Sequence, residues 1–290
     1  MKPLLLTLSL VILASCQTPS PSTIVHHADF PSAHVAARHV DVYLPEGYDP
    51  SGSTRYPVLY MHDGQNLFST ETAFGGMEWR IDEVMDSLKL KAIVVGVWNS
   101  PKRFLEYAPQ EPLVSDISPD GMEAIRIRLT EEPLSDAYLK FLVTELKPFI
   151  DSTYATKSDR ENTFIMGSSM GGLISLYAVN EYPEVFGGAA NVSTHWPLLL
   201  DRNTSYFMDA YLAYLDTTLP VASAPKLYFD HGTENLDANY AVHQVRMDSL
   251  MRAKAWPEDR WMTRVFEGDD HHERSWQKRV HIPLQFLLAD

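Results

Sequence analysis

Two adjacent serines, Ser168 and Ser169, lie between glycines in the segment ENTFIMGSSMGGLISLYAV. The residues before them form an apolar run typical of a buried strand, and those after them are typical of a helix, so GSSMGG would be the connecting turn. Such a sharp turn crowds the positions two before and two after its apex, which therefore favour glycine. These positions are Gly167 and Gly171 for Ser169, but both are methionine for Ser168. The spacing predicts Ser169 as a nucleophile, and the alternative is a glycine-rich turn without chemistry.

A nucleophilic serine needs a base that accepts its proton and an acid that holds this base in one tautomer. When the serine lies on a strand–turn–helix, the acid and the histidine follow it in that order, each after the end of a later strand. The predicted strand WMTRVFEG is followed by His271 and His272. The predicted strand KLYFDHG and the residues after it offer Asp230, Glu234 and Asp237. Position along the chain alone leaves the choice within each group open.

The segments that must position these residues alternate between strand-like and helix-like patterns from about Ala36 onward. Continuous apolar runs such as YPVLYMHDG, KAIVVGVWN and TFIMG predict strands that are buried on both faces. Between and after them, MEWRIDEVMDSLKL and DAYLKFLVTELKPFIDSTY have apolar residues at helical spacing. We therefore predict an α/β fold with a mostly parallel central sheet and helices on both faces, formed as one domain by residues 36–290.

Composition and charge narrow the range of partners. Of 290 residues, 45% are hydrophobic and 38 are acidic against 24 basic, which gives a net charge of -14. This balance indicates a globular chain and argues against nucleic acid as a partner. The stretches HDG and DDHH contain metal-ligating residue types, but neither a two-histidine helix nor a cysteine pair accompanies them. We expect no metal and no other cofactor.

The N-terminus predicts export. Residues 1–15 have a positive residue, an apolar run shorter than the roughly 20 residues of a membrane span, and small residues at its end, as in a signal peptide. The stretch LASC resembles a bacterial lipobox and contains Cys16, the one cysteine of the chain, as the residue that would be lipidated. Residues 16–35 would form a lipidated N-terminus and flexible tether. We expect a bacterial lipoprotein that is periplasmic or anchored to the outer membrane, and the alternative is an ordinary signal peptide.

Taken together, the motifs resemble those of the esterase D-like family of the α/β-hydrolases. Feruloyl and acetyl-xylan esterases, S-formylglutathione hydrolases and mycolyl transferases belong to that family. The resemblance extends over nearly all of residues 36–290. It rests on the stretches VYLPEGY, PVLYMHDGQNLF, IVVGVWN, EYAP, FIMGSSMGG, DHGTENLDANY and HHERSW.

This resemblance implies a role for each member of a Ser-His-Asp triad. Ser169 corresponds to the nucleophile. Relatives typically end in His-x-Glu-x-x-Trp, and HHERSW matches this with His271 as the base and His272 at the variable position. The match is looser for the acid, where LDANY favours Asp237 over Glu234.

An ester hydrolase also needs backbone N–H groups that stabilise the anion on the carbonyl oxygen. One donor should be Met170, the residue after the nucleophile at the start of the helix. The second should come from the loop after VLYMHDG, and we choose Gln65 among Gly64, Gln65 and Asn66.

Further residues could line a substrate cleft. His195 and Trp196 follow another predicted strand, and the alternative for them is a buried aromatic residue beside a capping histidine. Arg103, Glu106 and Tyr107 could form a cleft wall or a loop-stabilising ion pair.

We therefore expect a serine carboxylic-ester hydrolase that acts through an acyl-enzyme. Its substrate would be a small-molecule or oligosaccharide ester, and an acetylated or feruloylated carbohydrate is the best candidate. The alternatives are an acyltransferase on the same fold, a siderophore esterase and a catalytically silent binding lipoprotein. The lipid anchor would make the membrane a second partner.

Overall fold

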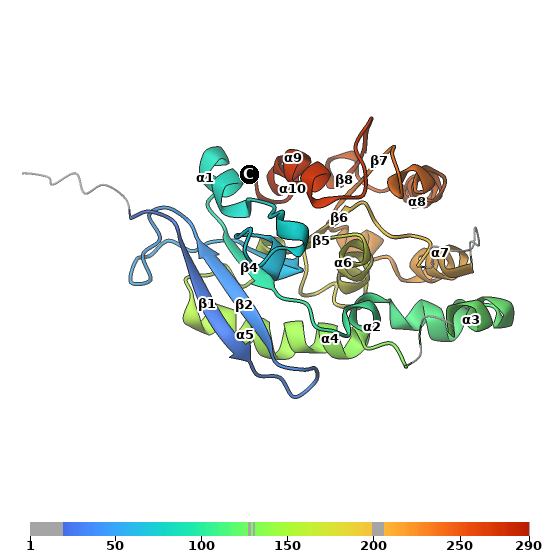
Figure 1. Ribbon diagram of the computed structural model, residues 1–290, viewed down its shortest axis with the longest axis horizontal. Helices are drawn as coiled ribbons and strands as arrows, with labels where there is room; N and C mark the ends of the chain where they lie inside the picture. Colours follow the sequence, from blue (N-terminus) through green and yellow to red (C-terminus); the bar gives the residue numbers. More distant parts are fainter. Residues whose placement is uncertain (1–19, 127–128, 130, 199–205, 290) are drawn as a thin grey trace, which may run out of the picture.

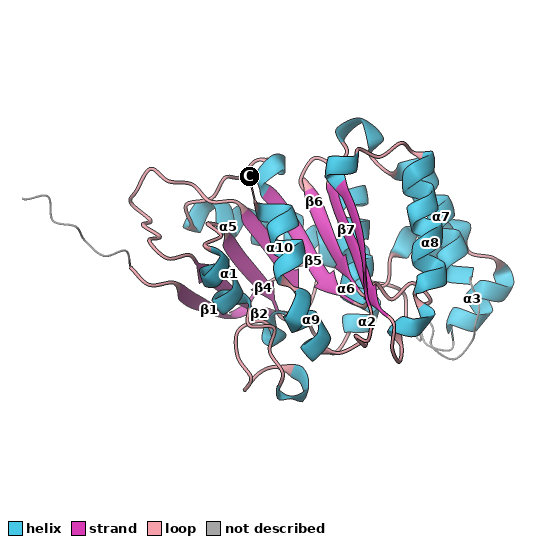
Figure 2. Cartoon of the chain, turned by 90° about the horizontal axis from the view of Figure 1, so that it is seen from above, coloured by secondary structure: helices cyan, strands magenta, loops and turns pink. Residues whose placement is uncertain are grey.

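The computed structural model describes residues 20–126, 129, 131–198 and 206–289, whose strands form an eight-stranded sheet (Figures 1 and 2). The strand order is β1-β2-β4-β3-β5-β6-β7-β8. The pairs from β4 to β8 are parallel, whereas β1 and β2 join that edge in antiparallel pairs. The strands are β1 Thr23–Phe30, β2 Arg38–Leu44, β3 Val58–His62, β4 Ile93–Val97, β5 Thr163–Ser168, β6 Gly188–Val192, β7 Lys226–Gly232 and β8 Trp261–Phe266.

Helices cover both faces of this sheet. Apolar side chains of α1, α9 and α10 pack on one face, and those of α4, α5, α6, α7 and α8 pack on the other. Alternate residues of each strand point to opposite faces, so Leu59 and Met61 of β3 join the first layer while Val58 and Tyr60 join the second. The predicted mostly parallel α/β sheet is confirmed. The helices are α1 Ile81–Leu88, α2 Arg103–Tyr107, α3 Pro119–Arg126, α4 Ser135–Phe141, α5 Lys147–Thr153, α6 Met170–Glu181, α7 Tyr206–Thr218, α8 Ala241–Ala253, α9 Glu273–Arg279 and α10 His281–Leu288.

Helix α6 lies at the centre of the molecule, directly after β5 (Figure 2). Its residues from Met170 to Asn180 are all buried. A helix that is apolar on every side requires neighbours on every side, and here β5, β6 and α2 contact it. The start of α6 is therefore held rigidly at the carboxyl ends of the parallel strands.

The N-terminal boundary of the domain differs from the prediction. The flexible tether expected over residues 16–35 is wrong for Thr23–Phe30, which form β1 and pair with β2 at one edge of the sheet (Figure 1). Val25 and Phe30 pack against the core, and the Phe30 ring lies 5.1 Å from that of Phe149. An edge strand needs only one paired side, so the polar residues of TIVHHADF are compatible with it.

The predicted signal peptide and Cys16 lie outside the described residues. Among the helices that are described, none has both the length and the apolar character needed to cross a membrane.

Candidate active site

Ser169 occupies the turn between β5 and α6 in a strained backbone conformation. Its φ is 58° and its ψ is -120°, a region that residues other than glycine rarely adopt. Its N–H donates to the carbonyl oxygen of Val192 on the neighbouring strand at 2.8 Å. This turn exposes the Ser169 hydroxyl to a cavity beyond the carboxyl ends of the strands.

The two glycines of this turn have different roles. A Cβ at Gly167 would lie 2.8 Å from the carbonyl carbon of Gly171, closer than real contacts allow, so the predicted need for glycine is confirmed there. A Cβ at Gly171 would meet nothing nearer than 3.5 Å, so the same prediction is wrong for that position. The crowding affects one glycine only, because a Cβ at Gly167 would point at the Gly171 backbone, whereas a Cβ at Gly171 would point toward His62.

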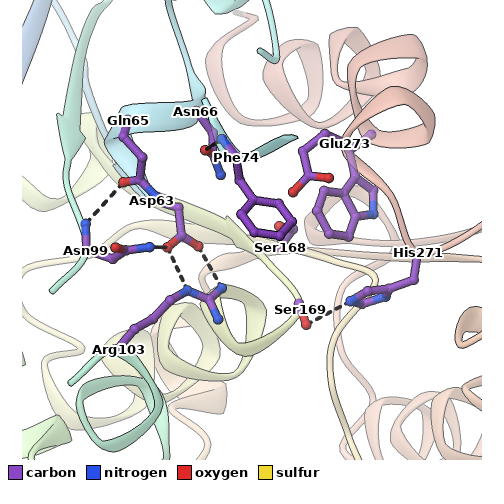
Figure 3. A pocket seen from close by; sticks show the side chains of 11 residues that line it. Asp63, Gln65, Asn66, Phe74, Asn99, Arg103, Ser168, Ser169, His271 and Glu273 are labelled. Atoms are coloured by element: carbon purple, nitrogen blue, oxygen red, sulfur yellow. Dashed lines mark hydrogen bonds and ion pairs between the residues drawn. The ribbon is translucent and has the colours of Figure 1, made fainter. Parts of the chain in front are cut away.

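Ser169, His271 and Asp237 form a continuous hydrogen-bonded chain. His271 lies on the loop after β8, and its Nε2 is 2.9 Å from the Ser169 hydroxyl (Figure 3). Its Nδ1 is 2.6 Å from Oδ1 of Asp237, which lies on the loop after β7. A carboxylate can only accept, so Nδ1 carries the proton and Nε2 is free to accept the serine proton.

The alternative residues for base and acid point elsewhere. His272 is exposed, and its Nδ1 accepts the N–H of Arg274 at 3.1 Å. Glu234 is exposed on the same loop as Asp237, and its backbone N–H binds the carbonyl oxygen of Asp269. Asp230 is buried against Arg279. The structure therefore brings Asp237 to His271, and neither Glu234 nor Asp230.

The second carboxylate oxygen of Asp237 is also fixed. It accepts the Gly232 N–H at 2.7 Å and the Ser193 hydroxyl at 2.6 Å. Ser193 Oγ itself accepts hydrogen bonds from Trp276 Nε1 and from Arg279 Nη2, so its single proton must point to Asp237. Burial alone would raise the pKa of Asp237, but the hydrogen bonds from His271, Ser193 and Gly232 hold it below its usual value. Asp237 is therefore an anion at neutral pH.

The buried side chain of Arg279 stabilises this arrangement. It is 2% exposed and forms ion pairs with three buried carboxylates, Asp230 at 3.1 Å, Asp269 at 3.2 Å and Asp237 at 3.8 Å. Burial raises the pKa of Asp230, although the neighbouring guanidinium opposes this shift. Arg279 thus joins the ends of β7 and β8 to α9, the elements that carry Asp237 and His271.

The catalytic cavity, as we name the space in front of Ser169, has a volume of about 280 Å³ (Figure 3). It is lined by Asp63, Gln65, Asn66, Phe74, Asn99, Arg103, Ser168, Ser169, His271, Glu273 and Trp276. Arg103 was expected either to form a cleft wall or to form a loop-stabilising ion pair, and it does both. It lines the cavity and forms a two-point ion pair with Asp63, with both N–O distances 2.7 Å. Within the described ranges, no group of three or more His, Cys, Asp or Glu side chains could hold a metal ion.

The loop after β3 brings Gln65 to this cavity. A Cβ at Gly64 would lie 2.5 Å from the carbonyl carbon of Gly96, so the loop presses against β4. The Gln65 side chain accepts the Asn99 N–H at 3.2 Å, and the Asn99 amide donates to Asp63 at 2.7 Å. Burial alone would raise the pKa of Asp63, but Arg103 and Asn99 hold it below its usual value. The oxyanion role of the Gln65 and Met170 amides stays a prediction.

The cleft prediction is wrong for Trp196 and His195. Trp196 is 1% exposed, and its indole N–H donates to Gln244 within the core. His195 is also buried, and its Nδ1 lies 2.6 Å from the Tyr240 hydroxyl, outside the lining of the catalytic cavity. Burial, with smaller contributions from the His271 and Arg103 charges, lowers the pKa of His195 to about 3. Both residues are buried, and the His195 ring lies 6.4 Å from that of His271.

Sequence reasoning missed several residues of the cavity wall. Asp63 and Asn99 follow β3 and β4, so the rule that strand ends converge could have found them. Glu273 and Trp276 lie in the HHERSW stretch but had no role assigned. Phe74 lies on an irregular loop in which no periodic pattern marks it.

A parallel sheet with a serine at the turn before its central helix, and with histidine and aspartate after later strands, defines an α/β-hydrolase. A family model described as "Putative esterase" matches residues 34–287, so the chain belongs to this family of ester hydrolases. The sequence-based resemblance is confirmed.

Individual relatives are distant. The chain is 22% identical over 267 residues to the uncharacterized protein YbbA of Bacillus subtilis (strain 168), covering 89% of this chain and 96% of YbbA. It is 26% identical over 185 residues to the ferri-bacillibactin esterase BesA of the same organism, covering 59% of this chain and 60% of BesA. A solved ferulic acid esterase has the same fold with a TM-score of 0.66 at 20% identity, covering 92% of this chain and 98% of the esterase.

Proposed function

We propose that this protein is a serine carboxylic-ester hydrolase that acts through an acyl-enzyme. The hydrogen-bonded chain from Ser169 through His271 to Asp237 is the observation that carries the proposal. It lies at the wall of a cavity large enough for a small acyl or sugar group, in a chain that belongs to an esterase family.

In the proposed reaction, Ser169 Oγ attacks the ester carbonyl carbon while His271 Nε2 accepts the hydroxyl proton. The Asp237 carboxylate stabilises the resulting imidazolium, and the amides of Met170 and Gln65 donate to the oxyanion. His271 then donates its proton to the departing alcohol, which leaves an acyl-enzyme. A water molecule repeats the sequence, releases the acid and restores Ser169.

For the substrate we propose a carbohydrate ester of acetyl or feruloyl type. The similarity to a ferulic acid esterase supports it, and the similarity to BesA supports a siderophore ester as the second candidate. Turnover of acetylated and feruloylated xylan, a ferric catecholate siderophore and simple aryl acetates by the purified domain tests both candidates. Absence of any turnover, together with absence of labelling by a serine-reactive phosphonate, would refute the enzyme assignment.

The acid of the triad can be tested separately. Asp237→Asn is expected to lower kcat by about 10³- to 10⁴-fold, because the amide cannot stabilise the imidazolium and favours the wrong histidine tautomer. Glu234→Gln, its matched control on the same exposed loop, should retain full activity. Steady-state kinetics on an aryl acetate measure both, and the reverse pattern would assign the role of acid to Glu234.

We also propose that the protein is exported and anchored through a lipid on Cys16. The proposal rests on the apolar run and the LASC stretch at the N-terminus. Cells that express the full chain should incorporate radioactive palmitate into the protein, and Cys16→Ser should abolish the incorporation while the protein is still made. Equal labelling of the two proteins would contradict the anchor.

A further inference from the structure

Glu273 has a carboxylate in the catalytic cavity that accepts no hydrogen bond from the residues that the structure describes. It is the first residue of α9, and its side chain is only 12% exposed. In Figure 3 the carboxylate points toward Phe74 and Ser168, and no dashed line reaches it. No described residue donates a hydrogen bond to it, whereas the carboxylates of Asp63 and Asp237 each accept at least three.

The nearest basic groups do not neutralise Glu273. His272 Nδ1 lies 3.8 Å from the Glu273 carboxylate, but this nitrogen accepts the Arg274 N–H and so carries no proton. Arg103 lines the same cavity, and its guanidinium already donates to both oxygens of Asp63. The Glu273 charge is a minor contribution to the raised pKa of Arg103, but the guanidinium hydrogen-bonds Asp63, which leaves Glu273 as the carboxylate of the cavity wall without a hydrogen-bonded cation among the described residues.

A carboxylate in a partly buried cavity loses its water when a ligand enters, and it then needs hydrogen-bond donors from that ligand. The first turn of a helix favours an acidic residue, which accounts for the residue type at this position. It does not account for the direction of the side chain, which points into the cavity toward Phe74 and Ser168 (Figure 3). A ligand that brings its own donors would satisfy the carboxylate, and its two oxygens suit a pair of neighbouring hydroxyl groups.

We infer that Glu273 is a specificity-determining residue that accepts hydrogen bonds from hydroxyl groups of a neutral carbohydrate ester. The same charge repels anionic esters, because Coulomb energies are strong in a partly buried site. The exposed Phe74 ring offers an apolar surface beside the carboxylate for the carbon face of the sugar. This inference rests on the proposed ester hydrolase activity and selects a neutral polyol over an acid as the substrate class.

Three acetyl esters that differ only in the alcohol separate these effects. They are a monoacetylated methyl xyloside with free hydroxyl groups, phenyl acetate without any, and the O-acetyl ester of lactate with a carboxylate. In Glu273→Gln, the ratio of kcat/KM for the xyloside ester to that for phenyl acetate should fall about tenfold or more, because hydrogen bonds to charged groups are the stronger ones. The ratio for acetyl-lactate to phenyl acetate should rise. Glu234→Gln, an exposed carboxylate outside the cavity, is the control and should leave both ratios unchanged.

The outcomes distinguish the two levels of the proposal. Turnover of phenyl acetate by the wild type with both ratios unchanged in Glu273→Gln would overturn the role of Glu273 and leave the esterase intact. An equal loss on all three esters would also overturn it, since that result indicates a structural contribution to α9. No turnover of any ester by the wild type would overturn the proposed function, and the specificity assignment with it.

Discussion

Ser169→Ala is expected to abolish ester hydrolysis, with kcat lower by about 10⁴-fold or more. The loss is large because the substitution removes the atom that would form the acyl-enzyme, and the rest of the triad has no function without it. The variant should fold normally, since the hydroxyl contributes only the bond to His271 on the protein side. Kinetics on an aryl acetate measure the loss, and a far-UV spectrum with a thermal unfolding curve verifies the fold.

Ser168→Ala is the matched control for this experiment. Ser168 ends β5, is 5% exposed and also lines the catalytic cavity, but the hydrogen bond of His271 is to Ser169. We expect the variant to keep activity within about tenfold of the wild type. If Ser168→Ala lost activity and Ser169→Ala kept it, the nucleophile assignment would be wrong.

Arg279→Met should cause the largest loss of stability of any single substitution discussed here. The guanidinium is buried between Asp230 and Asp269 and lies 3.8 Å from Asp237. Its removal leaves the buried Asp230 without its ion-pair partner and Asp269 paired with the exposed Lys278. Breaking a buried ion pair from one side costs about 3–5 kcal/mol of the free energy of unfolding. Activity should fall as well, because Ser193 loses one of the two donors that orient its proton toward Asp237.

Urea unfolding of the variant and of a surface control measures this effect. Arg246 pairs with Asp209 at 2.6 Å, and both side chains are well exposed. Arg246→Met should change the free energy of unfolding by less than about 1 kcal/mol, because exposed ion pairs contribute little. Equal losses in the two variants would contradict the buried network as a source of stability.

Local spacing was sufficient to predict that Ser169 lies at the tight turn between β5 and α6, because the crowding at this turn arises within a few residues of the chain. It was also sufficient to place His271 and His272 after the last strand. The choice between Glu234 and Asp237 could not be made in the same way, since the two residues follow the same strand and their side-chain directions depend on the packed neighbours. Here Ser193, directly after β6, and Gly232, at the end of β7, hold Asp237 in place.

The sheet was predictable because several of its buried parallel strands are continuous apolar runs. The edge strand β1 was missed for the opposite reason. Its burial alternates weakly, and its neighbouring Pro-, Ser- and Thr-rich residues are typical of a linker. Trp196 was misplaced because a position after a strand end does not distinguish a cavity wall from the core beneath it.

The start of β1 at Thr23 limits how far a lipid-anchored enzyme could move. Seven residue steps separate Thr23 from the proposed anchor at Cys16. A fully extended chain spans about 3.5 Å per residue, so the linker between Cys16 and Thr23 is roughly 25 Å long at most. A catalytic domain on so short a linker would stay at the membrane surface. It would bind polymeric substrates only where these reach that surface.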